Sequence, residues 1–169
     1  EGPNKYVSGT RFNYYEDTTK VFSDPVVEYS ITSLTNQDVE ATLRLPDGYK
    51  IVGDNKHLFS ENGEFEFTYI DYNNKEKTIK AEVTWIDKVI PTAKVEYDIT
   101  ESTQFMVKAT LRDFSKEGIT IINGDEDGGH TFHENGAFIF EIQDKAGNIG
   151  FVKAEVTWIV KDNDNKLVF

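Results

Sequence analysis

Residues 130–160 read HTFHENGAFIFEIQDKAGNIGFVKAEVTWIV, and residues 57–87 read HLFSENGEFEFTYIDYNNKEKTIKAEVTWID. The two stretches align without gaps at an offset of 73 and share 15 of 31 residues. An earlier pair, residues 27–44 and 95–112, aligns at an offset of 68 and shares 11 of 18 residues. Self-similarity of this kind is the signature of a duplicated module. The expected organisation is a leader or the end of a preceding module at 1–25, one domain at 26–88, a second at 89–160, and a tail at 161–169.

Apolar and polar residues alternate through both copies. In residues 39–44, Val39, Ala41 and Leu43 would face one side of a strand while the polar residues between them face the other. This period of two predicts half-buried antiparallel strands, and no stretch keeps a helical period for three turns. Asn-Gly pairs at 62–63 and 135–136 suit tight hairpin turns. The predicted strands lie near 26–32, 38–44, 48–52, 57–60, 63–70 and 76–87, and near 94–100, 105–112, 118–123, 130–133, 136–143 and 149–160.

Short strands with frequent turns and no helices favour an all-β fold of two tandem β-sandwiches. Each domain is small, so it needs a dense core, and the sequence supplies 12 Phe, 8 Tyr and 2 Trp. The expected core consists of inward-facing residues at matched positions: Val39, Leu43, Phe65, Phe67, Val83 and Trp85, and Val107, Leu111, Phe138, Phe140, Val156 and Trp158.

Three segments of the second copy carry a family signature. They are ENGAFIF at 134–140, DKAGN at 144–148 and AEVTWI at 154–159. This combination resembles the bacterial immunoglobulin-like modules of secreted and cell-surface proteins, which occur in glycoside hydrolases, mucin-directed peptidases and adhesins of Gram-positive bacteria. The resemblance covers residues 26–160 and implies immunoglobulin-like sandwiches that act as spacers, orienting arms or interaction modules. The first copy departs from the DKAGN segment, since residues 71–75 read DYNNK and Asn74 replaces Gly147. Asn tolerates left-handed backbone, so the turn is expected to survive.

Charge and cysteine content restrict the partners. The net charge of −12 comes from 30 acidic and 18 basic residues, and it disfavours binding to nucleic acid or anionic lipid. No apolar run is long enough for a membrane span, and no signal peptide is recognisable. The absence of Cys fits either a cytosolic protein or an exported protein of an organism that avoids disulfides. The chain begins at Glu1 without Met, which suggests a fragment of something larger. The alternatives for residues 10–22 are the end of a preceding module, an added edge strand and a partly ordered leader.

Catalytic chemistry finds little support in the residue pattern. His130 and His133 form the only close His pair, but three residues apart on a strand they face opposite ways, unlike the helical pair of zinc proteases. His57 matches His130, which suggests a shared structural role. Acidic residues on outward faces indicate a solvated surface rather than paired catalytic carboxylates. The fragment itself is expected not to be an enzyme, and a hydrolase is one candidate for its parent.

Two kinds of ligand remain as alternatives to the spacer. Calcium prefers clustered oxygen ligands in loops, and three loci qualify: Asp125 and Asp127 in an insertion of the second copy, Asp87 at the junction, and the Asp-Asn run at 162–165. Asp/Asn/Gly clusters also make ordinary soluble turns. Trp85 and Trp158 are candidates for stacking on glycan, although a Trp in phase with inward residues more often packs in a core.

The sequence therefore predicts a non-catalytic spacer or orienting tandem within an extracellular multimodular bacterial protein, secreted or attached to the cell wall. Its partners would be neighbouring domains of the same polypeptide. The alternative is an adhesion module that binds a host glycan or glycoprotein, in one version rigidified by calcium. No other cofactor is expected. Because potential ligand groups differ between the copies, a specific site should lie where the copies differ or at the junction between them.

Overall fold

The computed structural model describes residues 23–161, and these form two compact units. Within the described residues, the first unit contains 23–32 and 38–84, and the second contains 33–37 and 85–161. The division at Thr84 falls four residues before the boundary that the repeat predicted at 88. The expectations for residues 10–22 and 162–165 lie outside the described residues.

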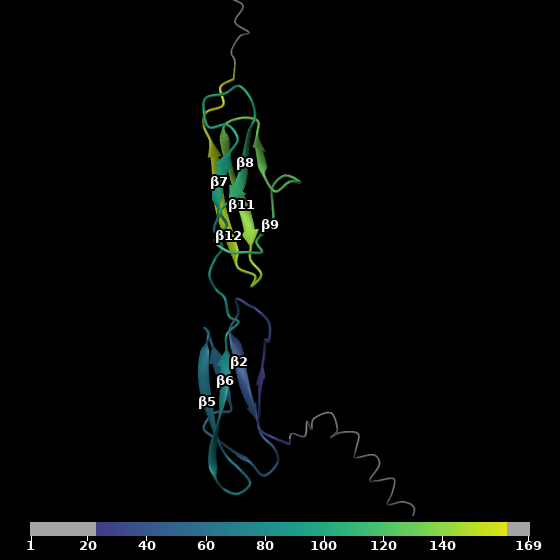
Figure 1. Cartoon of the computed structure of the whole chain (residues 1–169), viewed down its shortest axis with the longest axis vertical. Coiled ribbons are helices and arrows are strands. Elements are labelled where there is room, and N and C mark those ends of the chain that lie inside the picture. Colours follow the sequence, from purple (N-terminus) through teal and green to yellow (C-terminus); the bar gives the residue numbers. More distant parts are fainter. Residues whose placement is uncertain (1–22, 162–169) are drawn as a thin grey trace, which may run out of the picture. The chain divides into compact units, whose positions relative to one another are not determined.

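The first unit contains two three-stranded antiparallel sheets, one ordered β1-β2-β4 and the other β3-β5-β6 (Figure 1). Strands β5 and β6 form a hairpin that pairs residue by residue from Gly63 with Val83 to Ile70 with Glu76. The strands are β1 Val26–Tyr29, β2 Val39–Arg44, β3 Lys50–Val52, β4 Lys56–Phe59, β5 Gly63–Ile70 and β6 Glu76–Val83.

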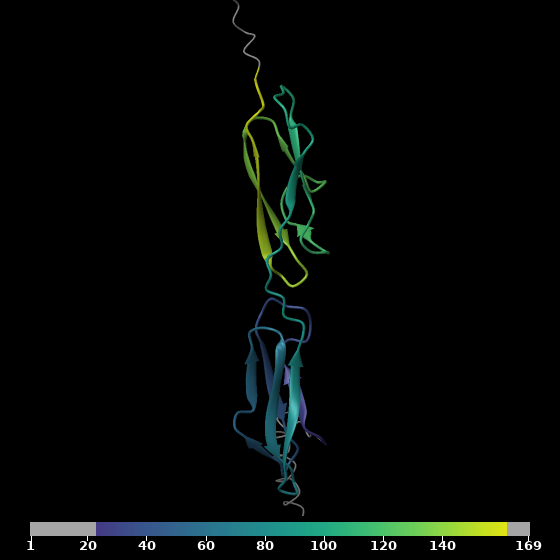
Figure 2. The same ribbon diagram turned by 60° about the vertical axis from the view of Figure 1, so that its left-hand side comes forward.

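The second unit repeats this arrangement, with sheets ordered β10-β8-β7 and β12-β11-β9. Figure 2 shows the two layers of this unit, with the yellow-green hairpin of β11 and β12 on one side and the teal strands β7 and β8 on the other. The strands are β7 Lys94–Tyr97, β8 Val107–Arg112, β9 Thr120–Ile121, β10 His130–Phe132, β11 Gly136–Gln143 and β12 Ile149–Val156.

A strand occupies each of the twelve positions that the alternating pattern predicted, and most are shorter than expected. The all-β fold is therefore confirmed, and its small antiparallel sheets are consistent with β-sandwiches. The described residues contain no helix, and so none that is long and apolar enough to cross a membrane.

The core follows the predicted alternation. On β2, Val39, Ala41 and Leu43 are at most 2% exposed, and their counterparts on β8 are similarly buried. In the second unit, residues of both sheets contribute to one apolar cluster, which explains why the two layers pack face to face. Its buried members are Val107, Ala109, Leu111, Phe132, Phe140, Ile142, Ala154, Val156 and Ile159.

Four aromatic residues expected in the core are only half-buried: Phe65, Phe138, Trp85 and Trp158. These four residues were predicted as core, and the structure places them at its borders rather than at its centre. Phe138 and Trp158 pack against the core cluster of the second unit without being enclosed by it. The next inward residue on each strand is the one that is enclosed, as Phe67 and Phe140 show.

Each half-buried Phe is covered by a histidine on the neighbouring sheet. His57 stacks on Phe65 with ring centroids 3.9 Å apart, and His130 stacks on Phe138 at 3.8 Å. The interplanar angles are 11° and 8°, so both pairs are nearly parallel. The imidazole ring thus closes the same border of the core in both copies, which is the shared structural role expected for this position.

The same backbone link occurs at the end of each copy. Thr35 forms a parallel bridge with Ile86, and Thr103 forms one with Ile159. The hydrogen bonds match as well, because the Val160 amide donates to the Thr103 carbonyl at 2.8 Å and the Asp87 amide donates to the Thr35 carbonyl at 2.8 Å. All these residues belong to the second unit.

Candidate functional site

The turn between β11 and β12 is organised by the carboxylate of Asp144. Its Oδ1 accepts hydrogen bonds from the backbone amides of Ala146 at 3.0 Å and Asn148 at 2.8 Å. Gly147 has a φ of 97°, in the left-handed region that favours glycine. The aspartate side chain therefore satisfies the amides of a tight turn, and its second oxygen, Oδ2, is left to bind other groups.

Lys116 binds that second oxygen. Its Nζ lies 2.7 Å from Asp144 Oδ2 and 2.8 Å from Asp87 Oδ2, and it also donates to the Val89 carbonyl. The amide nitrogen of Asn148 donates to Asp144 Oδ2 at 2.9 Å and to the Asp87 carbonyl at 2.8 Å. Lys116, Asp87, Asp144 and Asn148, which we call the Lys116 cluster, thus hold residues 87–89 against the turn.

The electrostatics of the cluster favour the charged form of every ionisable member. Desolvation by burial opposes ionisation of Asp144, but hydrogen bonds from Lys116 and Asn148 outweigh it and lower its pKa to about 2. The hydrogen bond from Lys116, followed by that from the Val89 amide, lowers the pKa of Asp87. Burial likewise opposes the charge on Lys116, yet its hydrogen bonds to Asp144 and Asp87 raise its pKa.

The directions of these pKa shifts decide which chemistry the cluster can perform. A general acid or base needs a pKa near the working pH, and a nucleophilic lysine needs a lowered one. Here both aspartates are held ionised and the lysine is held protonated at neutral pH. The geometry therefore fits an ion-pair clamp rather than proton transfer.

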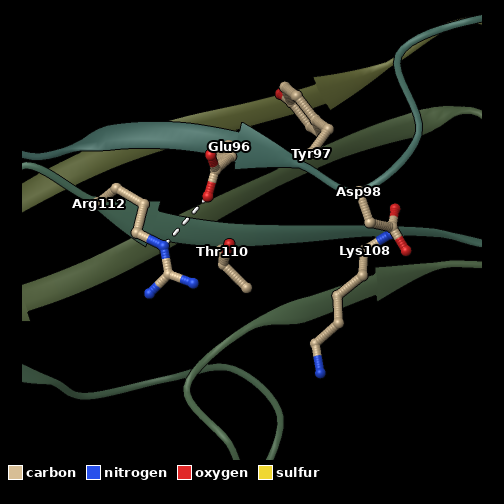
Figure 3. A pocket seen from close by; sticks show the side chains of 6 residues that line it. All are labelled: Glu96, Tyr97, Asp98, Lys108, Thr110 and Arg112. Carbon is tan, nitrogen blue, oxygen red and sulfur yellow. Dashed lines mark hydrogen bonds and ion pairs between the residues drawn. The ribbon is translucent and has the colours of Figure 1, made fainter.

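A shallow pocket of about 390 Å³ lies on the sheet that contains β7 and β8. Figure 3 shows Arg112 and Glu96 forming one side of it, with Arg112 Nε 3.1 Å from Glu96 Oε2, while Lys108 extends away from them beyond Thr110. The Asp98 carboxylate accepts the Lys108 amide at 2.7 Å. Paired charges of both signs line an open surface here, an arrangement that suits solvation and weak polar contacts.

The insertion that carries two of the calcium candidates is held by hydrogen bonds of its own. Asp125 Oδ2 accepts the Thr131 hydroxyl at 2.9 Å, and Asp127 Oδ1 accepts the Gly129 amide at 3.1 Å. Asp127 also pairs with Lys108 through Oδ2. Two of the three candidate calcium ligands, Asp87 and Asp127, therefore already have a lysine as their cation.

No three His, Asp or Glu side chains among residues 23–161 gather in a way that would hold a metal ion. The structure does not bring Asp87, Asp125 and Asp127 together into one such group. Calcium binding at these residues stays a prediction, and the direct measurement is whether EDTA lowers the melting temperature.

The indole ring of Trp158 makes two contacts. Its Nε1 donates to the Ile99 carbonyl at 3.0 Å, and Tyr97 lies edge-to-face with it at a centroid distance of 5.1 Å. Trp85 is also half-buried, and its carbonyl accepts the Thr35 amide at 3.0 Å. Glycan stacking at either residue stays a prediction, while the contacts of Trp158 are those of a packing residue.

Lys116 was not among the residues singled out from the sequence, although Asp87 was. Lys116 is one of 18 basic residues in the sequence, and no motif around it marks it as special. The available signal was a difference between the copies, since Asn148 stands where the first copy has Lys75 and Gly150 stands where it has Lys77.

Comparison of the chain with models of protein families, with curated proteins and with solved structures finds no match.

Proposed function

We propose that this chain is a non-catalytic spacer, a tandem of immunoglobulin-like β-sandwiches that orients neighbouring domains of an extracellular multimodular bacterial protein. The observation that carries the proposal is the Lys116 cluster. It binds residues 87–89, which follow the last strand of the first copy, into the second unit.

The state of the polar groups supports a structural role. Among the described residues, no buried side-chain nitrogen or oxygen lacks a hydrogen-bond partner. The charges of the Lys116 cluster are fully used in binding one another, as expected for a device that fixes geometry. The extracellular setting and the bacterial origin rest on the sequence resemblance alone.

The experiment measures how tightly the distance between the two units is defined. Because the chain has no Cys, a Thr78→Cys, Thr157→Cys double variant offers one labelling site in each unit, both exposed. An orienting spacer gives a narrow distance distribution between spin labels by pulsed electron paramagnetic resonance. We expect Lys116→Met to broaden that distribution.

The matched control is Lys80→Met, which removes an exposed pair between Lys80 and Glu64 in the first unit. This variant should leave the distribution unchanged because exposed pairs contribute little. A broad distribution in the unmodified chain, as wide as that of a flexible Gly/Ser linker, would contradict the spacer proposal.

A further inference from the structure

Within the second unit, the loop at residues 33–37 contacts the turn at residues 144–148. The amide of Asn36 donates to the Ala146 carbonyl at 3.1 Å, so that residues 33–37 cover the turn at 144–148. On the two sides of this contact Thr35 is 7% and Ala146 is 8% exposed, and Asn36 is half-buried, while residues 33, 34 and 37 of the loop stay exposed. A loop from one copy of the repeat thus covers a turn from the other.

The second copy has the same loop, at residues 101–105, and it is uncovered. Its local structure is equivalent, because the Phe105 amide donates to Thr103 Oγ1 at 3.0 Å as the Gln37 amide does to Thr35 Oγ1. Phe105 is nevertheless 75% exposed.

The neighbours of this loop are apolar and exposed as well. Met106 is 54% and Val160 is 51% exposed, and the Val160 amide joins the loop through its hydrogen bond to the Thr103 carbonyl. The first copy has Asp38 and Asp87 at the two matching positions. The loop of the second copy is thus more apolar than the loop that is covered.

The first copy has the matching turn, at residues 71–75, and it is also uncovered. Asp71 is buried and organises the turn, but residues 72–75 are all exposed. Tyr72 is 68% exposed and lies 5.9 Å from Tyr49, centroid to centroid. This turn therefore presents aromatic surface where the turn of the second copy is covered.

We propose that these two uncovered halves bind each other between two copies of this chain, head to tail. The loop at 101–106 of one copy covers the turn at 71–75 of the next. By the repeat offsets, the Gln104 amide donates to the Asn73 carbonyl, as Asn36 does to Ala146. Phe105 and Met106 pack on the exposed ring of Tyr72, and burial of this apolar surface drives the association.

The geometry determines the kind of assembly. The contact joins two different surfaces, so each added copy leaves one loop and one turn free. Association therefore produces a series of growing oligomers rather than a closed dimer. The net charge of −12 opposes it at low ionic strength, so the measurement belongs near 0.15 M salt, where the screening length is about 8 Å.

The test is analytical ultracentrifugation of the 169-residue chain up to about 1 mM, the range of a weak contact. We expect the average mass to rise with concentration without a plateau at the dimer. Phe105→Glu and Tyr72→Glu should each weaken association by about tenfold or more, since each buries a charge in the contact. Both positions are exposed, so the melting temperatures should stay close to that of the unmodified chain.

A mixture of the two variants gives the sharpest result. Phe105→Glu keeps its turn and Tyr72→Glu keeps its loop, so one pair of partners remains and the mixture should stop at a one-to-one dimer. The control is Ile139→Glu, at a residue that is 54% exposed on the outer face of β11, and it should associate like the unmodified chain.

Two results would overturn the inference. One is a chain that stays monomeric at about 1 mM, and the other is loss of association in Ile139→Glu but not in Phe105→Glu, which would place the interface on the sheet face. Either result leaves the spacer proposal standing, because that proposal is tested within a single chain.

Discussion

The turns at 71–75 and 144–148 are held by the same kind of hydrogen bonds, but the aspartate of each pairs with a different lysine. In each, an aspartate Oδ1 accepts two amides of the turn, from Asn73 and Lys75 in the first copy and from Ala146 and Asn148 in the second. The left-handed residue is Asn74 in one, with a φ of 61°, and Gly147 in the other, with a φ of 97°. The prediction that Asn would preserve the turn is confirmed.

The two turns differ in the partner of the second carboxylate oxygen of the aspartate. Asp71 Oδ2 pairs with Lys77 at 3.2 Å, a lysine from the adjacent strand whose side chain is 54% exposed. Asp144 Oδ2 pairs with Lys116, whose side chain is 20% exposed. Gly150 stands at the position of Lys77, and a Cβ there would overlap the Pro91 carbonyl oxygen. Close approach of the chain at Pro91 thus excludes the local lysine, and a distant one replaces it.

Both copies thus keep the residues that shape the turn, while the lysine that pairs with the aspartate of the turn differs between them.

The largest effect should be the same in both copies, because the core is shared. Phe67→Ala and Phe140→Ala each remove a ring that is at most 1% exposed, and each should cost about 3–5 kcal/mol of unfolding free energy. Phe138→Ala should cost about half of that because its ring is half-buried. Urea unfolding measures all three, and a Phe138 effect equal to that of Phe140 would contradict the border position of Phe138.

The lysines should differ. Lys116→Met leaves Asp144 with its charge and without its cation, and should destabilise the second unit by about 1–3 kcal/mol. Lys77→Met is the matched change in the first unit and should cost at most about 1 kcal/mol, because water already screens that pair. Thermal unfolding of the two variants compares them directly, and equal losses would show that burial does not distinguish the two turns.

The pH dependence should follow Asp144. Its pKa of about 2 in the folded chain lies below the unfolded value, so its stabilisation is present above about pH 4 and is lost as the pH falls toward 2. The loss should be on the order of 2 kcal/mol. In Asp144→Asn that part of the acid-induced loss should be absent. A variant that keeps the full acid dependence of the unmodified chain would assign the effect to other carboxylates.

The smallest effect should come from exchanging the left-handed residues. Gly147→Asn should cost about 1 kcal/mol, because a φ of 97° strains any side chain, Asn less than most, while a Cβ would meet Asn36 only at ordinary contact distance. Gly147→Val should cost clearly more, since a β-branched residue is strained at positive φ. Similar melting temperatures for the Asn and Val variants would show that backbone strain is not what selects these residues.

Periodicity located the strands most firmly where one face is buried, as on β2, β5 and β11, because a slip of one residue would turn that face to water. β3 is exposed along its whole length and has no such face. Alternation also identified Val39, Leu43, Phe67 and Phe140 as core residues. It did not separate Phe138 from Phe140, because alternation tells which face a residue is on and not how far it lies from the border of the sheet. The histidine that covers Phe138 comes from another strand, so its contact depends on how the two sheets pack.

The sequence by itself determined that this chain is all-β, where its strands lie, which residues face inward and which turn needs a left-handed residue. These are local properties, dictated by side-chain alternation and by backbone sterics. Only the tertiary structure decided that Lys116 joins Asp87 and Asp144, and that one loop is covered while its duplicate is exposed. Those outcomes depend on the approach of segments far apart in the chain, and a long flexible lysine carries no local signal of the carboxylate it will meet.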